Sequence, residues 1–280
     1  MKQINIITHN GIFHSDEVFA VAFLQFLYQE SKVIFERTRE KEVIAKAQQN
    51  KDTFVLDIGG VYQKEMRNFD HHQKEYQGEQ SSFGLLIDSL PKHQIKSLFP
   101  YIDAFQYFKK QLVKPIDKWD NNTNGIIQIA NHNDIYSLQR IINSFNQEIP
   151  FGLEQERAFV KAVDFAGSMI KKEIDAANDS IMEQYLCDQY LSEGQLVIRK
   201  DKAISKVFFK SFKGWAKKKG LRYLLLPIPN EKLNQDYIIY STQPQKHKLP
   251  EDSLSTFRHK AGFMILFKNY ENAIRYFDKL

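Results

Sequence analysis

The chain has 280 residues, of which 42% are hydrophobic and 13% aromatic, and its formal net charge is +5. This apolar content is enough for one large or two ordinary packed domains, and it excludes an intrinsically disordered chain. The single cysteine, Cys187, excludes an intramolecular disulfide framework and indicates a reducing compartment. No apolar run approaches about 18 residues and the N-terminus lacks a secretory pattern, so we expect a cytoplasmic protein without membrane spans.

The first 90 residues alternate between apolar strand-like runs and helical segments. Residues 4–9 predict a buried strand, and a helix follows from Ser15, the expected N-cap, to Gln29. Two more strands are predicted at 32–38 and 52–58, with a helix at 40–50 between them. A further helix is expected to begin at Ser81 and to stop at Pro91. Strands that alternate with helices imply right-handed crossovers, so this part predicts an α/β lobe with a parallel sheet flanked by helices.

Helical patterns dominate the middle of the chain. Residues 98–114 suit a helix that Pro115 is expected to interrupt. Residues 154–191 predict one long helix, or two, linking two lobes. The remainder predicts strands at 195–199, 221–227, 236–242 and 262–267, a lysine-rich helix at 203–219 and a final helix from Tyr270. This order is typical of a smaller α+β lobe.

The charge changes where the second lobe begins. Residues 1–195 carry 21 Lys and Arg against 27 Asp and Glu, a net charge of −6, whereas residues 196–280 carry 18 against 7, a net charge of +11. We therefore predict a first domain at 1–190 and a basic second domain at 195–280. The basic domain could hold a polyanion over the acidic one, or it could be a solvated lysine-rich surface.

Four short segments gather imidazoles and carboxylates after the predicted strands. They are His9, His14 and Asp16 in THNGIFHSDE, Asp57 in FVLDIGG, the triplet Asp70-His71-His72, and Asp117 with Asp120 in PIDKWDNN. Ligand sites of α/β sheets lie at the carboxyl ends of strands, so we interpret the four segments as one site. Such side chains can hold two Mn²⁺-class ions roughly 3.5 to 4 Å apart, which clamp a phosphoryl group and activate water.

The same segments resemble a known family. THNGIFHSDEVFAVAFL, VLDIGGVY, FDHHQ, SSFGLL and IDKWDNN follow the order and spacing of the Myg-type proteins, which are relatives of the DHH phosphoesterases. The resemblance implies a DHH-like N-terminal lobe and a metal-dependent hydrolase with two divalent ions. More narrowly, it implies a 3′ to 5′ exonuclease that takes single-stranded RNA as its substrate.

The resemblance also implies which residues hold each ion. The ligand sets, which share one bridging aspartate, would be His9, His14 and Asp57 for one ion and Asp16, Asp57, His71 and Asp120 for the other. In many DHH relatives the position of His14 is an aspartate. A neutral imidazole there lowers the negative charge of the site and favours Mn²⁺ over Mg²⁺.

Three more residues have implied supporting roles. His72 would be catalytic and face the phosphate, and Asp70 would orient its neighbours. The family pattern places the ligand on the second aspartate of D-x-x-D-N, so Asp117 would support the site without binding metal. Each aspartate taken alone could equally be a helix cap or a turn residue.

A segment of the basic domain interleaves cations with aromatic residues. SKVFFKSFKGWAKKKGLRY contains Lys217, Lys218, Lys219 and Arg222, our candidates for substrate binding, among five aromatic residues. Cations beside aromatic platforms are typical of single-strand binders. An amphipathic helix with its aromatic residues turned inward would give the same pattern, so both interpretations stay open.

Two other functions fit the same residues. One is hydrolysis of a small phosphate compound, such as pyrophosphate or a short oligonucleotide, with the same metals. The other is a non-catalytic, metal-stabilised binding protein. Leu249-Pro250-Glu251 matches the family, but the tryptophan- and glycine-rich stretches expected around it are missing. The departure leaves open the length and polarity of the substrate, and the sequence does not fix the oligomeric state.

Overall fold

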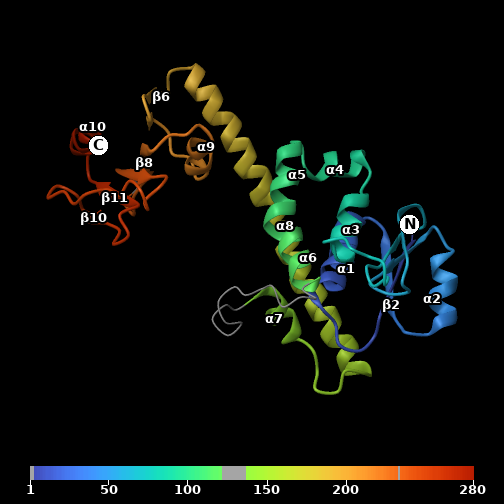
Figure 1. The fold of residues 1–280 in the computed structure, drawn as a ribbon. Coiled ribbons are helices and arrows are strands. Elements are labelled where there is room, and N and C mark those ends of the chain that lie inside the picture. Colours follow the sequence, from blue (N-terminus) through green and yellow to red (C-terminus); the bar gives the residue numbers. More distant parts are fainter. Residues whose placement is uncertain (1–2, 122–136, 233) are drawn as a thin grey trace. The chain divides into compact units, whose positions relative to one another are not determined.

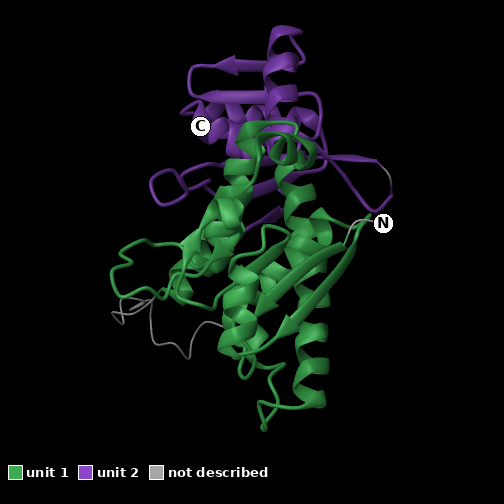
Figure 2. Cartoon of the chain, turned by 90° about the vertical axis from the view of Figure 1, so that its right-hand side faces the viewer, with its two compact units in different colours: residues 1–178 green, residues 179–280 purple. Residues whose placement is uncertain are grey.

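The computed structural model describes residues 3–121, 137–232 and 234–280. By its internal contacts the chain divides into two compact units, unit 1 at residues 1–178 and unit 2 at residues 179–280 (Figure 2). The division falls inside the long helix α8 (Leu153–Ser192), so one helix contributes residues to both units. The domain boundary predicted from the sequence, at 190–195, lies at the end of this helix, because the changes in charge and composition occur only there.

Unit 1 is built on a five-stranded sheet with the order β2-β1-β3-β5-β4. β1 (Gln3–Thr8), β2 (Lys32–Arg37), β3 (Thr53–Leu56) and β5 (Asn68–Phe69) run parallel, and β4 (Tyr62–Gln63) is antiparallel to β5. The predicted α/β lobe with a parallel sheet is confirmed. The carboxyl ends of β1, β3 and β5 therefore lie at one edge of the sheet, and each of them leads into a segment of the predicted site.

Helices cover both faces of this sheet (Figure 1). α2 (Lys41–Gln48) packs on one face through an apolar cluster that includes Ile44 and Val55. α1 (Ser15–Leu27) lies on the other face beside α3 (Ser82–Ser89). All residues of α1 from Ser15 to Leu24 are buried, as expected of a helix enclosed on every side.

The next helices bring the last predicted site segment to the sheet. α4 (Lys92–Leu98) and α5 (Ile102–Phe108) lead through a π-helical turn at Lys109–Val113 into α6 (Lys114–Asp120). The expectation that Pro115 interrupts the helix is wrong. The π turn changes the hydrogen-bond register just before the proline, which needs no N–H donor at the start of the new register, so the helix continues to Asp120.

α8 is a single helix of 40 residues, preceded by the short α7 (Leu138–Asn143). Its buried apolar positions, which include Phe159, Val163 and Ala166, recur every three or four residues along one side. The opposite side is charged and exposed. Accordingly, in the part of the chain that the structure describes, no helix is both long enough and apolar enough to span a membrane.

Unit 2 contains a six-stranded sheet with the order β10-β11-β9-β8-β7-β6. Its strands are β6 (Leu196–Arg199), β7 (Lys202–Ser205), β8 (Tyr223–Pro229), β9 (Gln235–Ser241), β10 (Phe257–Arg258) and β11 (Met264–Phe267). β7 and β8 are parallel, and every other pair in this sheet is antiparallel. The predicted helix at 203–219 is wrong over its first half, because residues 202–205 are a strand between β6 and β8.

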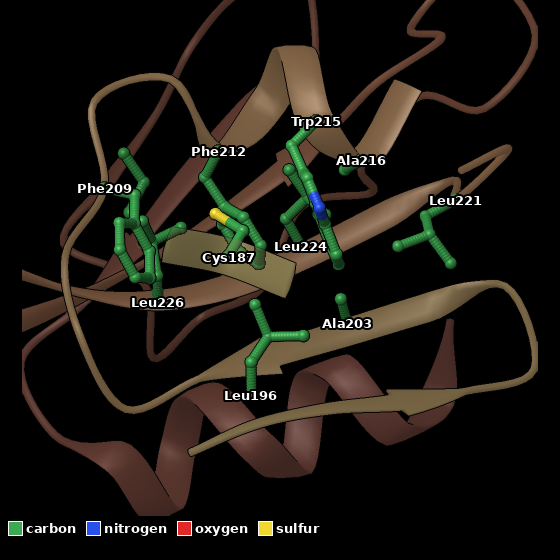
Figure 3. Close-up of a cluster of buried hydrophobic side chains, with 11 residues drawn as sticks. Cys187, Leu196, Ala203, Phe209, Phe212, Trp215, Ala216, Leu221, Leu224 and Leu226 are labelled. Carbon is green, nitrogen blue, oxygen red and sulfur yellow. The ribbon is translucent and has the colours of Figure 1, made fainter. Parts of the chain in front are cut away.

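The two faces of this sheet are covered by different helices. α9 (Phe212–Lys218) and the end of α8 bury the cluster shown in Figure 3, which includes Cys187, Trp215 and Leu224. α10 (Tyr270–Lys279) packs on the opposite face, over a cluster that includes Leu225 and Phe277. Leu224 and Leu225 are neighbours on β8 and point to opposite faces, as alternation along a strand requires.

Candidate metal centre

Three strands of unit 1 end directly in ionisable residues. His9 follows β1, Asp57 follows β3 and Asp70 follows β5. Asp57 has a φ of 54°, in the left-handed region that aspartate tolerates better than most residues. The chain reverses there and leads through Gly59 and Gly60 into β4. The parallel strands thus gather these side chains at one edge of the sheet.

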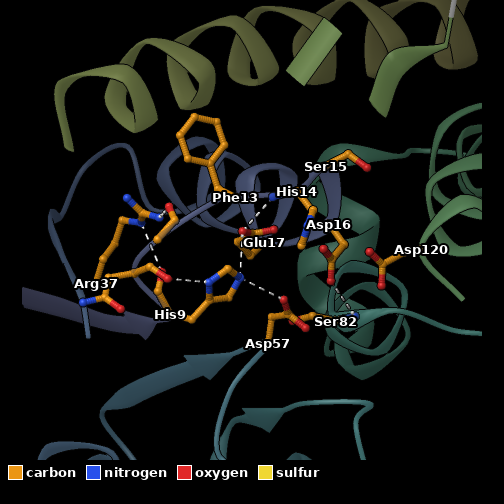
Figure 4. A network of polar contacts seen from close by, with 12 residues as sticks. His9, Phe13, His14, Ser15, Asp16, Glu17, Arg37, Asp57, Ser82 and Asp120 are labelled. Carbon is orange, nitrogen blue, oxygen red and sulfur yellow. Dashed lines mark hydrogen bonds and ion pairs between the residues drawn. The ribbon is translucent and has the colours of Figure 1, made fainter. Parts of the chain in front are cut away.

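His9 lies between two buried carboxylates (Figure 4). Its Nε2 is 3.0 Å from Glu17 Oε1 and 3.3 Å from Asp57 Oδ2. The N-cap of α1 is His14, one residue before the predicted Ser15, and the His14 N–H donates to Glu17 Oε1 at 2.8 Å. Glu17 therefore joins His9, His14 and Asp57 in a group whose potential ligand atoms lie within 4.8 Å of one another.

Glu17 was not predicted as a site residue. An acidic side chain in the first turn of a helix is already accounted for by its favourable interaction with the helix macrodipole, so it does not by itself indicate a site. The sequence signal for Glu17 is its place beside Asp16 in the HSDE motif. Both acidic side chains of this motif are fully buried in the structure.

A second histidine lies on the other side of Asp57. His71 Nε2 is 2.9 Å from Asp120 Oδ2, 3.3 Å from Asp57 Oδ1 and 3.9 Å from Asp16 Oδ2. The two oxygens of Asp57 thus face different histidines, Oδ2 toward His9 and Oδ1 toward His71. This is the arrangement that a carboxylate shared by two ions needs.

The six residues predicted as metal ligands come together in this region. Besides the group around His9, potential ligand atoms gather in two sets, Asp57 with His71 and His72, and His14 with Asp16 and Asp120. The sequence assigned His72 to the phosphate, whereas its ring also lies within ligand distance of this cluster.

The donor set fits divalent cations. Asp16, Glu17, Asp57 and Asp120 bring four carboxylates together, and the first three are at most 6% exposed. Asp16 Oδ1 and Glu17 Oε2 are buried and accept no hydrogen bond from the described residues. Buried carboxylate oxygens without partners carry a large desolvation cost that bound cations offset. Mixed carboxylate and imidazole donors are typical of sites for Mn²⁺ and similar ions.

The electrostatics of the cluster depend on the same carboxylates. Burial lowers the pKa of His9, but Glu17 and Asp57 outweigh it and raise this pKa to about 10. Burial also lowers the pKa of His71, but Asp120 and Asp57 outweigh this effect and raise the pKa to about 10. Desolvation, together with the neighbouring Asp57 and Asp120 carboxylates, raises the pKa of Asp16 well above its usual value. Without bound metal, the two imidazoles hold protons that cations would have to displace.

His72 is oriented by Asp70. Its ring is 61% exposed, and Nδ1 is 2.8 Å from Asp70 Oδ1, which also accepts the His72 N–H at 3.1 Å. Asp70 is itself fixed by the N–H of Gly60. The hydrogen bond to Asp70 raises the pKa of His72 against the effect of burial. With Nδ1 bound to Asp70, Nε2 is the ring nitrogen free to contact a substrate.

Asp117 supports the site from α6. Its Oδ1 accepts the Ser81 hydroxyl at 2.8 Å and the N–H groups of Ser81 and Gly84 at 3.1 Å, so it binds the N-terminus of α3. A Cβ at Gly84 would collide with this carboxylate. Burial raises the pKa of Asp117 to about 6 despite these hydrogen bonds. The adjacent Ser82 N–H donates to Asp16 at 3.3 Å, which links Asp117 to the cluster.

A buried arginine fixes the loop that carries His9. Arg37 Nε donates to the His9 carbonyl at 3.1 Å and Nη2 to the Gly11 carbonyl at 2.8 Å. Its Nη1 pairs with Glu156 of α8 at 2.9 Å, and the guanidinium lies over the ring of Phe159. Nothing in the local sequence of Arg37 indicates this role, because the partners lie far along the chain.

The four predicted substrate-binding cations belong to unit 2 and are exposed. Lys219 pairs with Asp188 at 2.9 Å, and Arg222 pairs with Asp201. Lys217 and Lys218 make no ion pair with the described residues. The aromatic residues of this segment do not form a platform: Phe209, Phe212, Trp215 and Tyr223 are buried in the two cores, and only Phe208 is exposed. Packing therefore explains most of the cation and aromatic pattern.

Comparison with known proteins agrees with the motifs. The model of the family MYG1_exonuc, described as uncharacterised protein family UPF0160, matches residues 5–249. The chain belongs to this family. This confirms the Myg-type family predicted from the five motifs.

Three curated relatives illustrate the similarity. The MYG1 protein of Chlamydia trachomatis serovar D is 32% identical over 167 residues, 59% of this chain and 52% of the relative. The MYG1 protein of Dictyostelium discoideum is 31% identical over 181 residues, 64% and 47% of the two chains. The MYG1 exonuclease of Homo sapiens is 38% identical over 77 residues, 27% and 19%. The match with the first two spans about half of the relative's length.

Among solved structures, a pGpG-specific phosphodiesterase from Vibrio cholerae aligns over 99% of this chain and 97% of its own, with 9% identity and a TM-score of 0.34. That similarity is too weak to establish a shared fold.

Proposed function

We propose that this chain is a metal-dependent phosphodiesterase, and more narrowly a 3′ to 5′ exonuclease on single-stranded RNA that uses two divalent ions, with Mn²⁺ the best fit. The observation that carries the proposal is the position of Asp57. Its two carboxylate oxygens face His9 and His71 inside a cluster of carboxylates and imidazoles. The family includes relatives named MYG1 exonuclease, which agrees with cleavage of nucleic acid.

The chain would hold the ions through residues from separate strands and helices. His9, His14, Glu17 and Asp57 would bind one ion, and Asp16, Asp57, His71 and Asp120 the other. When bound, such ions polarise a phosphoryl group and lower the pKa of a coordinated water. Arg37 and Asp117 would keep the ligand loops in place, and this preorganisation lets the carboxylates act without rearrangement.

His72 would act as the general acid. Its exposed ring can reach a substrate, and Asp70 holds Nδ1 and keeps the imidazole in one orientation. Because Asp70 raises the pKa of His72, the ring carries a proton over more of the neutral range than a free histidine. Nε2 would then donate a hydrogen bond to the phosphate and a proton to the leaving oxygen.

A panel of substrates tests this proposal. The protein is loaded with Mn²⁺, Co²⁺ or Mg²⁺ and given end-labelled single-stranded RNA, single-stranded DNA, pyrophosphate and bis(p-nitrophenyl) phosphate. We expect stepwise shortening of RNA from its 3′ end, and loss of both the metal and the activity in Asp57→Asn. The matched control is Asp52→Asn, the same chemical change on an exposed turn five residues earlier.

Three outcomes would change the proposal. Hydrolysis of pyrophosphate or of very short oligonucleotides alone would assign a small phosphate substrate to the same site. Metal binding without hydrolysis of any substrate would favour a metal-stabilised binding protein. Full activity of Asp57→Asn would show that the cluster is not the active site.

A further inference from the structure

One face of the unit 2 sheet is only partly covered. α10 packs over Leu225 and Ile239, which are paired across β8 and β9. Ile204, Pro227 and Tyr237 share this face, because Ile204 pairs with Leu225, Pro227 pairs with Tyr237, and both pairs keep the same alternation. A cavity of about 360 Å³ lies over these side chains, and Tyr270, the first residue of α10, lines it.

The cavity has cations at both ends. Arg199 is the last residue of β6 and Lys206 follows β7, and the two strands are antiparallel, so the side chains lie at opposite ends of this hairpin. Both are exposed, and neither pairs with a carboxylate of the described residues. No aspartate or glutamate is among the residues that line the cavity. Lys219 and Arg222, on the predicted segment, are by contrast already neutralised.

Two tyrosines form one wall. The rings of Tyr237 and Tyr270 lie edge to face with centroids 5.4 Å apart, and Tyr270 is 44% exposed. Val197, which is 38% exposed, provides further apolar surface together with Ile204 and Pro227. The cavity volume is at the lower end of the roughly 300 to 1,000 Å³ of small-ligand sites, which suits one or two planar rings.

We infer that this cavity binds an unpaired nucleotide of single-stranded nucleic acid. The base would lie against Tyr270 and Tyr237, and the backbone would cross the hairpin between Arg199 and Lys206. Net charge favours a polyanion over the other candidate occupants: residues 196–280 carry 18 basic against 7 acidic side chains, and the charged residues that line the cavity, Arg199 and Lys206, are both cations. The inference rests on the proposed nuclease function and adds a substrate site on the face of the sheet opposite α9.

Binding without catalysis tests the site. Fluorescence anisotropy is measured with a 5′-fluorescein single-stranded RNA of roughly 12 nucleotides, in EDTA so that no hydrolysis occurs. Tyr270→Ala should raise Kd about tenfold, the loss of one stacked base, whereas Tyr270→Phe should bind like the wild type. Arg199→Glu with Lys206→Glu should reduce the slope of log K against log salt by about 1.4, because two phosphate contacts are lost.

The control is Lys161→Glu with Lys172→Glu, two exposed positions on α8 with the same change in net charge. It should keep the wild-type slope. If Tyr270→Ala does not fold, crosslinking of a 4-thiouridine RNA to wild-type protein decides instead, with the crosslinks expected on Tyr237 or Tyr270. Unchanged affinity and slope in folded variants, or crosslinks confined to other segments, would overturn the inference.

This result is separable from the proposed function. If the wild type binds RNA through the cavity but hydrolyses no phosphodiester with any metal, the nuclease proposal fails and the binding site stands. If bis(p-nitrophenyl) phosphate is hydrolysed while the cavity variants bind RNA normally, the binding site fails. A self-association of the chain that Tyr270→Ala abolishes, without any change in RNA affinity, would assign the cavity to a second copy and overturn the inference.

Discussion

The edge of the sheet in unit 1 holds buried charged side chains, whereas the basic surface of unit 2 holds exposed ones. At the sheet edge, Asp16, Glu17 and Asp57 are almost completely buried, and their neighbours are other potential ligands. On the surface of unit 2, charged side chains reach solvent, and two of the four predicted substrate cations pair with nearby aspartates. Buried charges must be compensated, so their arrangement restricts the function, whereas exposed pairs contribute little and restrict it less.

Replacing the two histidines of the triplet gives the largest contrast within the buried cluster. His71→Ala should lose metal, because His71 contacts Asp57 and Asp120. His72→Ala should keep metal and lose roughly 10² to 10⁴ in kcat, the range for a general acid. Elemental analysis and turnover on bis(p-nitrophenyl) phosphate measure both effects. If His72→Ala also lost metal, His72 would be a ligand, as its proximity to Asp57 allows.

Glu17 tests whether the structure adds a ligand that the motifs did not identify. Glu17→Gln keeps the hydrogen bond to the His14 N–H but removes a buried charge 3.0 Å from His9. We expect metal affinity to fall about ten- to hundredfold, with kcat at saturating metal affected less. Titration calorimetry with Mn²⁺ measures this, and Glu42→Gln on the exposed side of α2 is the control. Equal affinity in both variants would limit Glu17 to capping α1.

Proton competition predicts how metal binding depends on pH. The pKa values of His9 and His71 are raised to about 10, so both rings are protonated at neutral pH in the metal-free chain and must lose protons to bind cations. Affinity should therefore rise with pH, by about tenfold per pH unit for each proton displaced. Calorimetry in buffers of different ionisation enthalpy counts the protons. Affinity that is flat between pH 6 and 8 would contradict this assignment.

The smallest effect is expected on the exposed surface. Replacing Lys217, Lys218 and Lys219 together removes two cations that form no ion pair with the described residues and one that already pairs with Asp188. The slope of log K against log salt for single-stranded RNA should flatten by about 1.4 at most, and hydrolysis of a small ester should not change. Binding titrations at several salt concentrations check this. An unaltered slope would make these lysines a solvated surface.

Local patterns were enough to predict much of unit 1. Apolar runs that end in His9 and Asp57 predicted strands whose carboxyl ends meet, because parallel strands with crossover helices allow little else. The motifs also identified the family, which the match over residues 5–249 confirms. The prediction of a helix at 203–219 failed because lysine and alanine favour helices, whereas the pairing of residues 202–205 with both neighbouring strands overrides this local preference.

The sequence by itself determined the first three strands of unit 1 with the helices between them, the family, and the six predicted residues of the cluster, since these follow from periodicity and from motifs of short range. The tertiary structure alone decided what depends on contacts between distant segments. Examples are the position of Glu17 beside His9, the hydrogen bond from Arg37 to the His9 loop, and the continuation of the helix through Pro115. Contacts between distant segments also bury the aromatic residues around α9 in a core, because the free energy gained by burying large rings outweighs the local pattern of charge.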